Sequence, residues 1–213
     1  MAKVLIIGAS SGIGYEATRQ ALCHGHETVA FSRSAGRLAL SDPKLTLMPG
    51  NALKPQEVRQ ALDGVDAVIQ ALGVRLTPKT MLFPVTLFSA ATRILIAEME
   101  HVGVGRLLAV TGLGTGESRA ALPVPARPAF DLVLGRAYDD KGYQERLIEN
   151  SGLDWTLVRP GILTDGSHTG RYRVLVDPND WRPGFISRAD VADFMVRNMT
   201  NPLFSRKAAA LIY

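Results

Sequence analysis

The chain has 213 residues, of which 46% are hydrophobic and 21% charged, so its composition is that of a folded domain and not of a disordered segment. Its formal charge is +4 without any run of Lys or Arg, which argues against a nucleic-acid partner and suits a phosphate-rich cofactor. No apolar stretch approaches the ~18 residues of a membrane span, so we expect a cytoplasmic protein without a membrane partner.

The first half of the chain alternates between short apolar runs and stretches with helical spacing. Runs rich in Val, Ile and Leu predict strands at residues 4–7, 27–31, 45–48 and 65–72. Apolar residues that recur every three or four positions predict helices at 12–24 and 55–62, and a longer one within 80–101.

The second half continues this alternation after a long connection. Residues 106–110 and 155–158 predict strands, and a helix is expected to end near residue 150. Residues 112–128 are rich in Gly and Pro without a clear period, and connections of this length are usually functional or mobile.

The tail adds a short strand at 172–176, a helix that begins at Ser187 with Asp190 at its third helical position, and a strand at 209–212. Repeated alternation of strands and helices predicts a parallel sheet with helices on both faces. We therefore expect a single doubly wound α/β domain over residues 1–213.

A glycine-rich loop, GASSGIG at residues 8–14, lies between the first predicted strand and the first predicted helix. There Gly8 allows a tight turn, Gly12 lets a pyrophosphate approach the backbone, and Gly14 lets helix and strand pack closely. The free N–H groups and the dipole at the helix start favour phosphates. The alternative is a glycine-rich turn without a ligand. The predicted dinucleotide loop comprises Gly8, Ser10, Ser11, Gly12, Ile13 and Gly14.

The end of the second predicted strand decides which dinucleotide is preferred. An NAD site places Asp or Glu there, whereas this chain has Phe-Ser-Arg-Ser at residues 31–34 and no carboxylate. The guanidinium of Arg33 can bind a 2′-phosphate bidentately, with hydroxyl donors from Ser10, Ser32 or Ser34 and help from Arg37. The alternative is a solvated surface arginine. We predict NADP(H) as the cofactor.

Six segments in a fixed order carry a resemblance to a known family: GASSGIG, GNALKPQEV, DAVIQALG, ENSGLDWTLVRPGIL, DGSHTGRYRV and FISRADVADFM. Through them nearly the whole chain resembles the short-chain dehydrogenase/reductase superfamily. Within it, the chain is similar to the atypical NAD(P)H-binding branch with NmrA-like proteins and the biliverdin reductase B (flavin reductase) group. The resemblance implies a Rossmann-type fold with a small C-terminal extension on the substrate side. Its substrate-side segments are expected at about 112–137 and 161–186.

The resemblance also implies roles for loops at the carboxyl ends of the strands, where open α/β sheets bind their ligands. Asn51 and Ala52 would lie beside the adenine, and Ala71, Leu72 and Gly73 would line the adenosine ribose. Thr111 and Gly112 would lie under the nicotinamide, and the loop of Pro160, Gly161, Ile162 and Leu163 would touch its carboxamide.

Conventional members of the superfamily use a tyrosine as proton donor, a lysine four residues later that binds the ribose, and a serine that orients the substrate. Registering the helix by Lys141 and Glu145 places Lys141 at the lysine position and Ala137 at the tyrosine position. Tyr138 lies one residue later, rotated by about 100° around the helix. It is either a residue near the substrate or a packing residue.

The serine position is also altered, because Gly112 stands where the biliverdin reductase B group carries Ser. Thr111 has a hydroxyl but lies one residue early, so we expect it to support the site and not to replace the serine. The predicted catalytic residues are therefore Lys141, Thr111 and Tyr138.

Other polar residues carry weaker hypotheses. His168, Arg171 and Tyr172 follow the predicted carboxamide loop, although a lone histidine in a Gly-rich loop is usually solvated. Trp181 is expected to pack and could border the pocket. The single cysteine, Cys23, excludes an internal disulfide and is expected to be buried. No spacing of His, Cys, Asp or Glu indicates a metal site.

The altered proton-handling residues shape the functional hypothesis. Hydride transfer needs a well-placed nicotinamide, and flavins or quinones accept a hydride without a dedicated protein acid. We therefore predict an NADPH-dependent oxidoreductase that acts, as a monomer or homodimer, on a small planar flavin- or quinone-like acceptor. The alternative is a non-catalytic NADP(H)-binding sensor or assembly factor of the NmrA-like type. A third hypothesis is isomerase or epimerase chemistry on a nucleotide-linked sugar.

Overall fold

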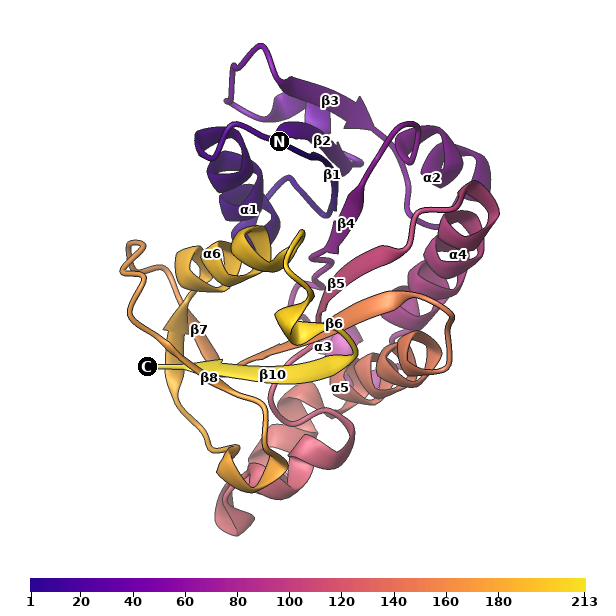
Figure 1. Cartoon of the computed structure of the whole chain (residues 1–213). Coiled ribbons are helices and arrows are strands. Elements are labelled where there is room, and N and C mark those ends of the chain that lie inside the picture. Colours follow the sequence, from indigo (N-terminus) through magenta and orange to yellow (C-terminus); the bar gives the residue numbers. More distant parts are fainter.

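A computed structural model describes the whole chain, residues 1–213, and its centre is an eight-stranded sheet (Figure 1). Every neighbouring pair of strands is parallel except β10 and β8. In spatial order the strands are β3 (Leu45–Pro49), β2 (Glu27–Ser32), β1 (Lys3–Ile7), β4 (Ala67–Gln70), β5 (Arg106–Val110), β6 (Asp154–Pro160), β10 (Lys207–Ile212) and β8 (Arg173–Leu175).

Helices cover both faces of the sheet. On one face lie α1 (Gly12–Cys23) and α6 (Arg188–Asn198), which pack against each other (Figure 1). On the other face lie α2 (Pro55–Ala61), α4 (Leu87–Val102) and α5 (Arg127–Glu149). This is a Rossmann-like doubly wound α/β fold, and the predicted fold class is confirmed.

The sheet is apolar on both faces because helices bury both of them. In β1, Val4 and Ile6 belong to the core beneath α1 and α6, whereas Leu5 and Ile7 belong to the core beneath α2 and α4. Successive side chains of a strand point to opposite faces, so a strand buried on both sides has no polar alternation. Truncation of a buried helix residue such as Leu95 to Ala is expected to cost roughly 2–5 kcal/mol of unfolding free energy.

The long helix predicted within residues 80–101 is α4, and a separate short helix that was not predicted, α3 (Pro78–Leu82), precedes it. Phe83 has extended backbone angles, φ −110° and ψ 152°. It precedes Pro84, and the proline ring disfavours helical backbone in the residue before it. The break therefore follows from the covalent structure of proline.

The stretch 112–128, predicted to lack a regular period, contains two short 3-10 helices at Gly116–Ala121 and Val124–Ala126. Helix α5 then begins at Arg127 with proline in its first turn, where the missing N–H costs nothing. Ser187 caps α6 as predicted, since its side chain accepts a hydrogen bond from the Asp190 backbone.

A second, two-stranded parallel sheet was not predicted. It joins β7 (Ile162–Thr164) to β9 (Phe185–Ser187). The two segments approach closely at Gly161, where a Cβ would lie 2.3 Å from the Gly184 carbonyl oxygen. These strands have only three residues each, too few for a periodic signal.

The expectation for Cys23 was wrong. Cys23 is the last residue of α1 and is exposed. The buried apolar face of that helix is formed by Ala17 and Ala21 instead. No helix of the fold is both long enough and apolar enough to cross a membrane.

Candidate active site

The loops after β1 and β4 meet at the point where the strand order reverses direction. Gly8 has φ +90°, and a Cβ there would lie 2.6 Å from the Ala71 carbonyl oxygen. The Ala71 N–H in turn donates to the Ile7 carbonyl at 2.8 Å. Open α/β sheets bind ligands in the crevice at such a switch point. The neighbouring Gly73 has open space around it.

Gly14 and Gly12 shape the start of α1 differently. A Cβ on Gly14 would overlap the Gly8 carbonyl, so the helix packs directly against the loop. Gly12, at φ +57°, would meet only the Arg188 side chain, at 3.7 Å. Because Ser11 makes no side-chain cap, the first-turn N–H groups remain available for an anion. Ile13 is buried in the core, so only its backbone can face a ligand.

The end of β2 is attached to this loop, since Gly8 N donates to the Phe31 carbonyl at 2.9 Å. The Ser32 hydroxyl is buried without a hydrogen-bond partner. The Arg33 side chain is exposed and forms no ion pair with any carboxylate. An orphaned hydroxyl beside a free guanidinium fits a phosphate group.

The end of β3 reaches the same edge of the sheet. Gly50 N donates to the Ser32 carbonyl at 3.0 Å. Asn51 N donates to the Glu57 carboxylate at 2.7 Å, and the Asn51 side-chain oxygen accepts the N–H two residues on. Its side chain is thus engaged within its own loop, while Ala52 packs against the core.

Lys141 of α5 is fastened to the end of β5. Its Nζ donates to the Thr111 carbonyl at 2.7 Å and lies 4.5 Å from the centre of the Phe88 ring. Burial lowers the pKa of the Lys141 ammonium to about 8, and the carboxylates of Glu145 and Asp140 partly oppose this shift. The group therefore stays mainly protonated at neutral pH.

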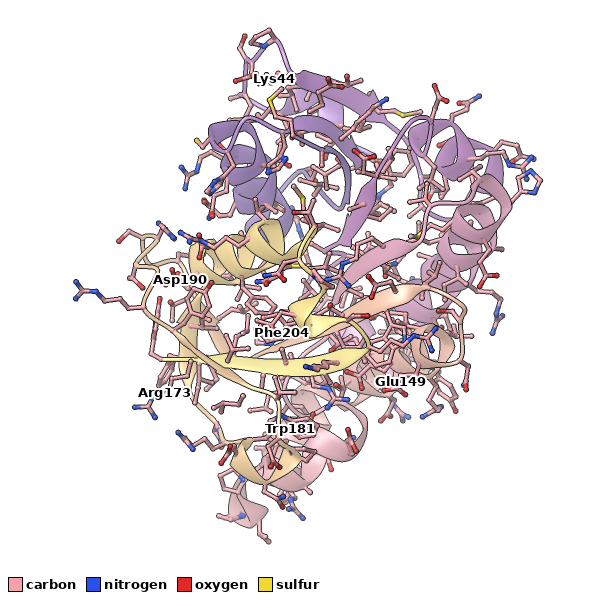
Figure 2. The ribbon with its side chains drawn as sticks, viewed as in Figure 1. Lys44, Glu149, Arg173, Trp181, Asp190 and Phe204 are labelled. Carbon is pink, nitrogen blue, oxygen red and sulfur yellow. The ribbon has the colours of Figure 1, made fainter.

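The Thr111 hydroxyl points into a buried polar network centred on Glu145. Glu145 Oε1 accepts from Thr111 Oγ1 and Thr115 Oγ1, each at 2.7 Å, and from Arg159 Nε at 2.9 Å. The Arg159 guanidinium stacks 4.6 Å from the Trp181 ring, which lies on the β8–β9 connection (Figure 2). The Thr111 hydroxyl is therefore used in a hydrogen bond to Glu145 that stabilises the end of β5.

Tyr138 reaches the residue after Thr111. A Cβ on Gly112 would lie 2.6 Å from the Tyr138 hydroxyl oxygen. The ring packs edge-on against Phe130 with centroids 4.7 Å apart. Burial raises the pKa of the Tyr138 phenol, so it is protonated at neutral pH. Ala137, at the expected tyrosine position, is a buried core-facing residue.

The loop after β6 is held by backbone hydrogen bonds. Leu113 N donates to the Pro160 carbonyl at 3.0 Å, and Ile162 N donates to the Gly184 carbonyl at 2.8 Å. Ile162 pairs in register with Phe185, and both side chains are more than half exposed. The loop therefore presents an apolar rim.

Residues 168–172, which carried weaker hypotheses, contact α6. His168 Nε2 lies 3.1 Å from Asp193, and the Tyr172 hydroxyl donates to the same carboxylate at 2.8 Å. The Thr169 N–H donates to Asp190, the buried acid labelled in Figure 2, at 2.9 Å. The His168 and Tyr172 side chains therefore hold this loop against α6, whereas the Arg171 side chain is exposed.

Arg188, at the start of α6, was not singled out from the sequence. Besides facing Gly12, its Nη1 pairs with the exposed Asp165 at 2.6 Å. The two residues border a small pocket of about 160 Å³ beside the first turn of α1. Arg188 is far from the glycine loop along the chain, so no local sequence pattern indicates that the two lie together.

A sequence profile described as NAD(P)H-binding matches residues 8–202. The chain belongs to this NAD(P)H-binding family. Among solved structures it is similar to ChuY of Escherichia coli O157:H7, described as an anaerobilin reductase. The identity is 28% and the TM-score 0.80, over 99% of this chain and 96% of ChuY. The chain is thus an NAD(P)H-binding, reductase-like protein, and the resemblance to the atypical branch is confirmed.

Two curated relatives of this NAD(P)H-binding chain have other descriptions. It is 26% identical to the photosystem II assembly factor Ycf39 of Synechocystis, over 99% of this chain and 62% of that protein. The chain therefore spans less than two thirds of that relative's length. It is 30% identical to an uncharacterized sugar epimerase, YhfK of Bacillus subtilis, over 92% of this chain and 87% of the relative.

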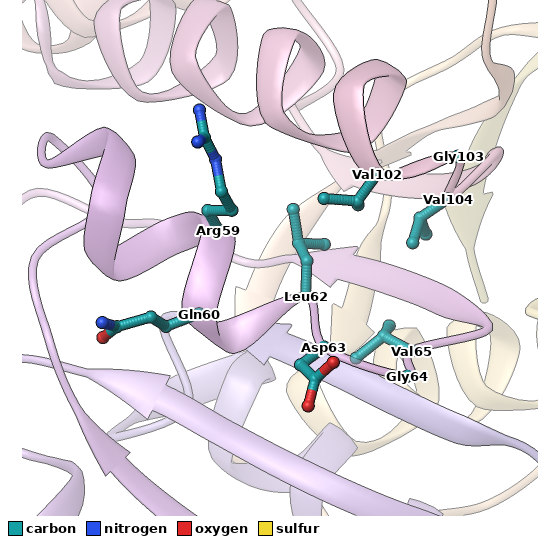
Figure 3. Close-up of a pocket in the computed structure, with 9 residues that line it drawn as sticks. All are labelled: Arg59, Gln60, Leu62, Asp63, Gly64, Val65, Val102, Gly103 and Val104. Atoms are coloured by element: carbon teal, nitrogen blue, oxygen red, sulfur yellow. The ribbon is translucent and has the colours of Figure 1, made fainter.

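A wider depression of about 580 Å³ lies elsewhere on this NAD(P)H-binding chain (Figure 3). It is lined by the ends of α2 and α4 and the loops that lead into β4 and β5, including Arg59, Asp63 and Val102. These loops are at the amino ends of the strands, opposite the glycine loop. Ligands of parallel sheets bind at the carboxyl ends, so this depression is not the cofactor crevice.

Proposed function

We propose that the protein is an NADPH-dependent reductase that transfers a hydride to a small planar acceptor of the flavin or quinone type. The observation that carries the proposal is the set of strand ends gathered around the β1–β4 switch point. The glycine loop, Arg33 with Ser32, and Lys141 all belong to that edge of the sheet, as a dinucleotide requires.

The preference for NADPH rests on the end of β2. Arg33 has no carboxylate partner, and the buried Ser32 hydroxyl has no partner at all. A 2′-phosphate would satisfy both groups, and an adenosine ribose without the phosphate would leave the guanidinium unused. The glycine-loop N–H groups and Arg188 would hold the pyrophosphate, while Lys141 would hold the nicotinamide ribose.

The choice of a planar acceptor rests on the end of β5. When bound, the nicotinamide supplies the hydride. The chain's own groups orient the reactants: Lys141 and Thr111 keep the strand end rigid, and Ile162 with Phe185 offers apolar contact. The hydroxyls of Thr111 and Thr115 are committed to Glu145. A delocalised acceptor that takes its proton from water suits this site, and the likeness to a protein described as an anaerobilin reductase supports the same class.

Activity is tested by following the loss of NADPH absorbance with purified protein and a panel of FMN, riboflavin, menadione and biliverdin. We expect saturable turnover with at least one acceptor, and NADH to be a poorer donor. Tight NADPH binding without turnover of any acceptor would overturn the reductase proposal.

A second candidate function is a non-catalytic NADP(H)-binding assembly factor. The likeness to Ycf39 over 99% of this chain favours it. It predicts cofactor binding without turnover, together with a partner protein whose capture depends on NADP(H). An Arg33→Asp variant, which removes the proposed contact with the 2′-phosphate, would then lose the partner as well as the cofactor.

A further inference from the structure

The hydroxyl groups of Thr111, Thr115 and Tyr138 all lie near the carboxyl end of β5, and only that of Tyr138 is free. Thr111 and Thr115 both donate to Glu145 at 2.7 Å. Tyr138 forms no hydrogen bond, and its half-buried ring packs between Gly112 and Phe130. The Tyr138 hydroxyl is not among the buried unpaired polar atoms of the fold, so it keeps contact with solvent and is available to a ligand.

The placement of Tyr138 is tied to that of Lys141. The two residues are three positions apart on α5, so they lie on the same side of the helix about one turn apart. They reach consecutive residues of the strand end: Lys141 donates to the Thr111 carbonyl, and Tyr138 covers Gly112. Because Gly112 has no side chain, the phenol fills the space that any other residue there would occupy.

We propose that the Tyr138 hydroxyl orients the acceptor by donating a hydrogen bond to it at the end of β5. This inference rests on the proposed reductase function and adds the group that selects an oxygen- or nitrogen-bearing planar ring. The phenol keeps its proton throughout. Burial raises the Tyr138 pKa, which makes it a donor and not a base at neutral pH.

The decisive variant is Tyr138→Phe, which keeps the ring and its contact with Phe130 and removes only the hydroxyl. The probes are FMN and menadione, titrated into the protein saturated with NADP⁺ and followed by fluorescence quenching. We expect roughly 3- to 10-fold weaker acceptor binding, the effect of one hydrogen bond. The affinity for NADP⁺ alone should change by less than about twofold.

Tyr143→Phe is the matched control. It is the same chemical change on the same helix, but Tyr143 is 59% exposed and stacks on Arg146. We expect no change in acceptor binding. A packing role for Tyr138 would give the opposite pattern for the main variant: Tyr138→Phe would match the wild type and only Tyr138→Ala would lose affinity.

A rescue experiment uses the close approach to Gly112. Gly112→Ser alone should weaken acceptor binding, because its side chain meets the Tyr138 hydroxyl. In the double variant Tyr138→Ala/Gly112→Ser the space is open again and a hydroxyl returns, so affinity should exceed that of Tyr138→Ala by several-fold. Equal affinities of these two variants would contradict the proposal.

The two proposals fail differently. If the wild-type complex with NADP⁺ binds no acceptor of the panel and turns none over, the reductase function is wrong and this inference with it. If the wild type turns over an acceptor and Tyr138→Phe has unchanged KM and kcat for it, the inference alone is wrong.

Discussion

The Lys141 ammonium donates a 2.7 Å hydrogen bond to the Thr111 carbonyl and thereby joins the middle of α5 to the end of β5. Burial lowers its pKa from the usual value of 10.5 to about 8. The Lys141 ammonium therefore both connects α5 to β5 and titrates near neutral pH at the candidate cofactor site.

The first prediction concerns pH. We expect the affinity for NADPH to fall as the pH rises through about 8, because Lys141 then loses the charge that attracts the cofactor. Fluorescence titrations of NADPH between about pH 6.5 and 9.5 measure this step. Lys141→Met should abolish it, whereas Lys207→Met, an exposed lysine at the start of β10, should retain it.

The same shift affects stability with a defined sign. Between about pH 8 and 10.5 the folded chain has released the Lys141 proton and the unfolded chain still holds it. The Lys141 contribution to the free energy of unfolding therefore rises with pH in that window and is least favourable below pH 8. Urea unfolding of wild type and Lys141→Met across the window measures the difference.

The second prediction concerns cofactor choice. Arg33→Asp should weaken NADPH by roughly 10- to 100-fold, the effect of losing charge-assisted hydrogen bonds, and should change NADH far less. Isothermal titration with both cofactors measures this. Arg93→Asp, an exposed arginine on α4 without an ion pair, is the control. An equal loss for NADPH and NADH would rule out a clamp on the 2′-phosphate.

The third prediction separates Arg188 from Arg33. Arg188→Met should weaken NADPH and NADH by the same factor, because the side chain faces Gly12 and not the end of β2. Asp165→Asn frees Arg188 from its ion pair and should tighten both cofactors by up to a few-fold, since exposed pairs contribute little. If either variant changed the affinity for NADPH but not for NADH, Arg188 would not contact the pyrophosphate.

The fourth prediction concerns the buried pair of Glu145 and Arg159. Glu145→Gln leaves the buried Arg159 charge with only the exposed Glu117 carboxylate at 3.4 Å and should cost about 3–5 kcal/mol of unfolding free energy in urea. The double variant Glu145→Gln/Arg159→Met removes both charges and should recover part of that loss. If both variants were equally unstable, the loss would come from packing and not from the unpaired charge.

The local patterns predicted most of the regular structure. Strands β1 to β6 are recognisable because buried parallel strands are continuous apolar runs, and the glycine loop is recognisable because its backbone needs glycine at set positions. The separate short helix α3 before Pro84 and the two-stranded sheet of β7 and β9 were missed. Strands and helices of three to five residues carry too little periodicity to be recognised.

The sequence by itself determined the fold class, the glycine loop, the absence of an acid after β2 and the displacement of Tyr138 by one residue, because each is a property of a few neighbouring residues. Only the tertiary structure decided where those residues meet. It packed α5 so that Tyr138 covers Gly112, occupied the Thr111 hydroxyl with Glu145, and brought Arg188 to Gly12. These contacts join segments far apart in the chain, and they depend on the order of strands and the packing of helices, which no local pattern encodes.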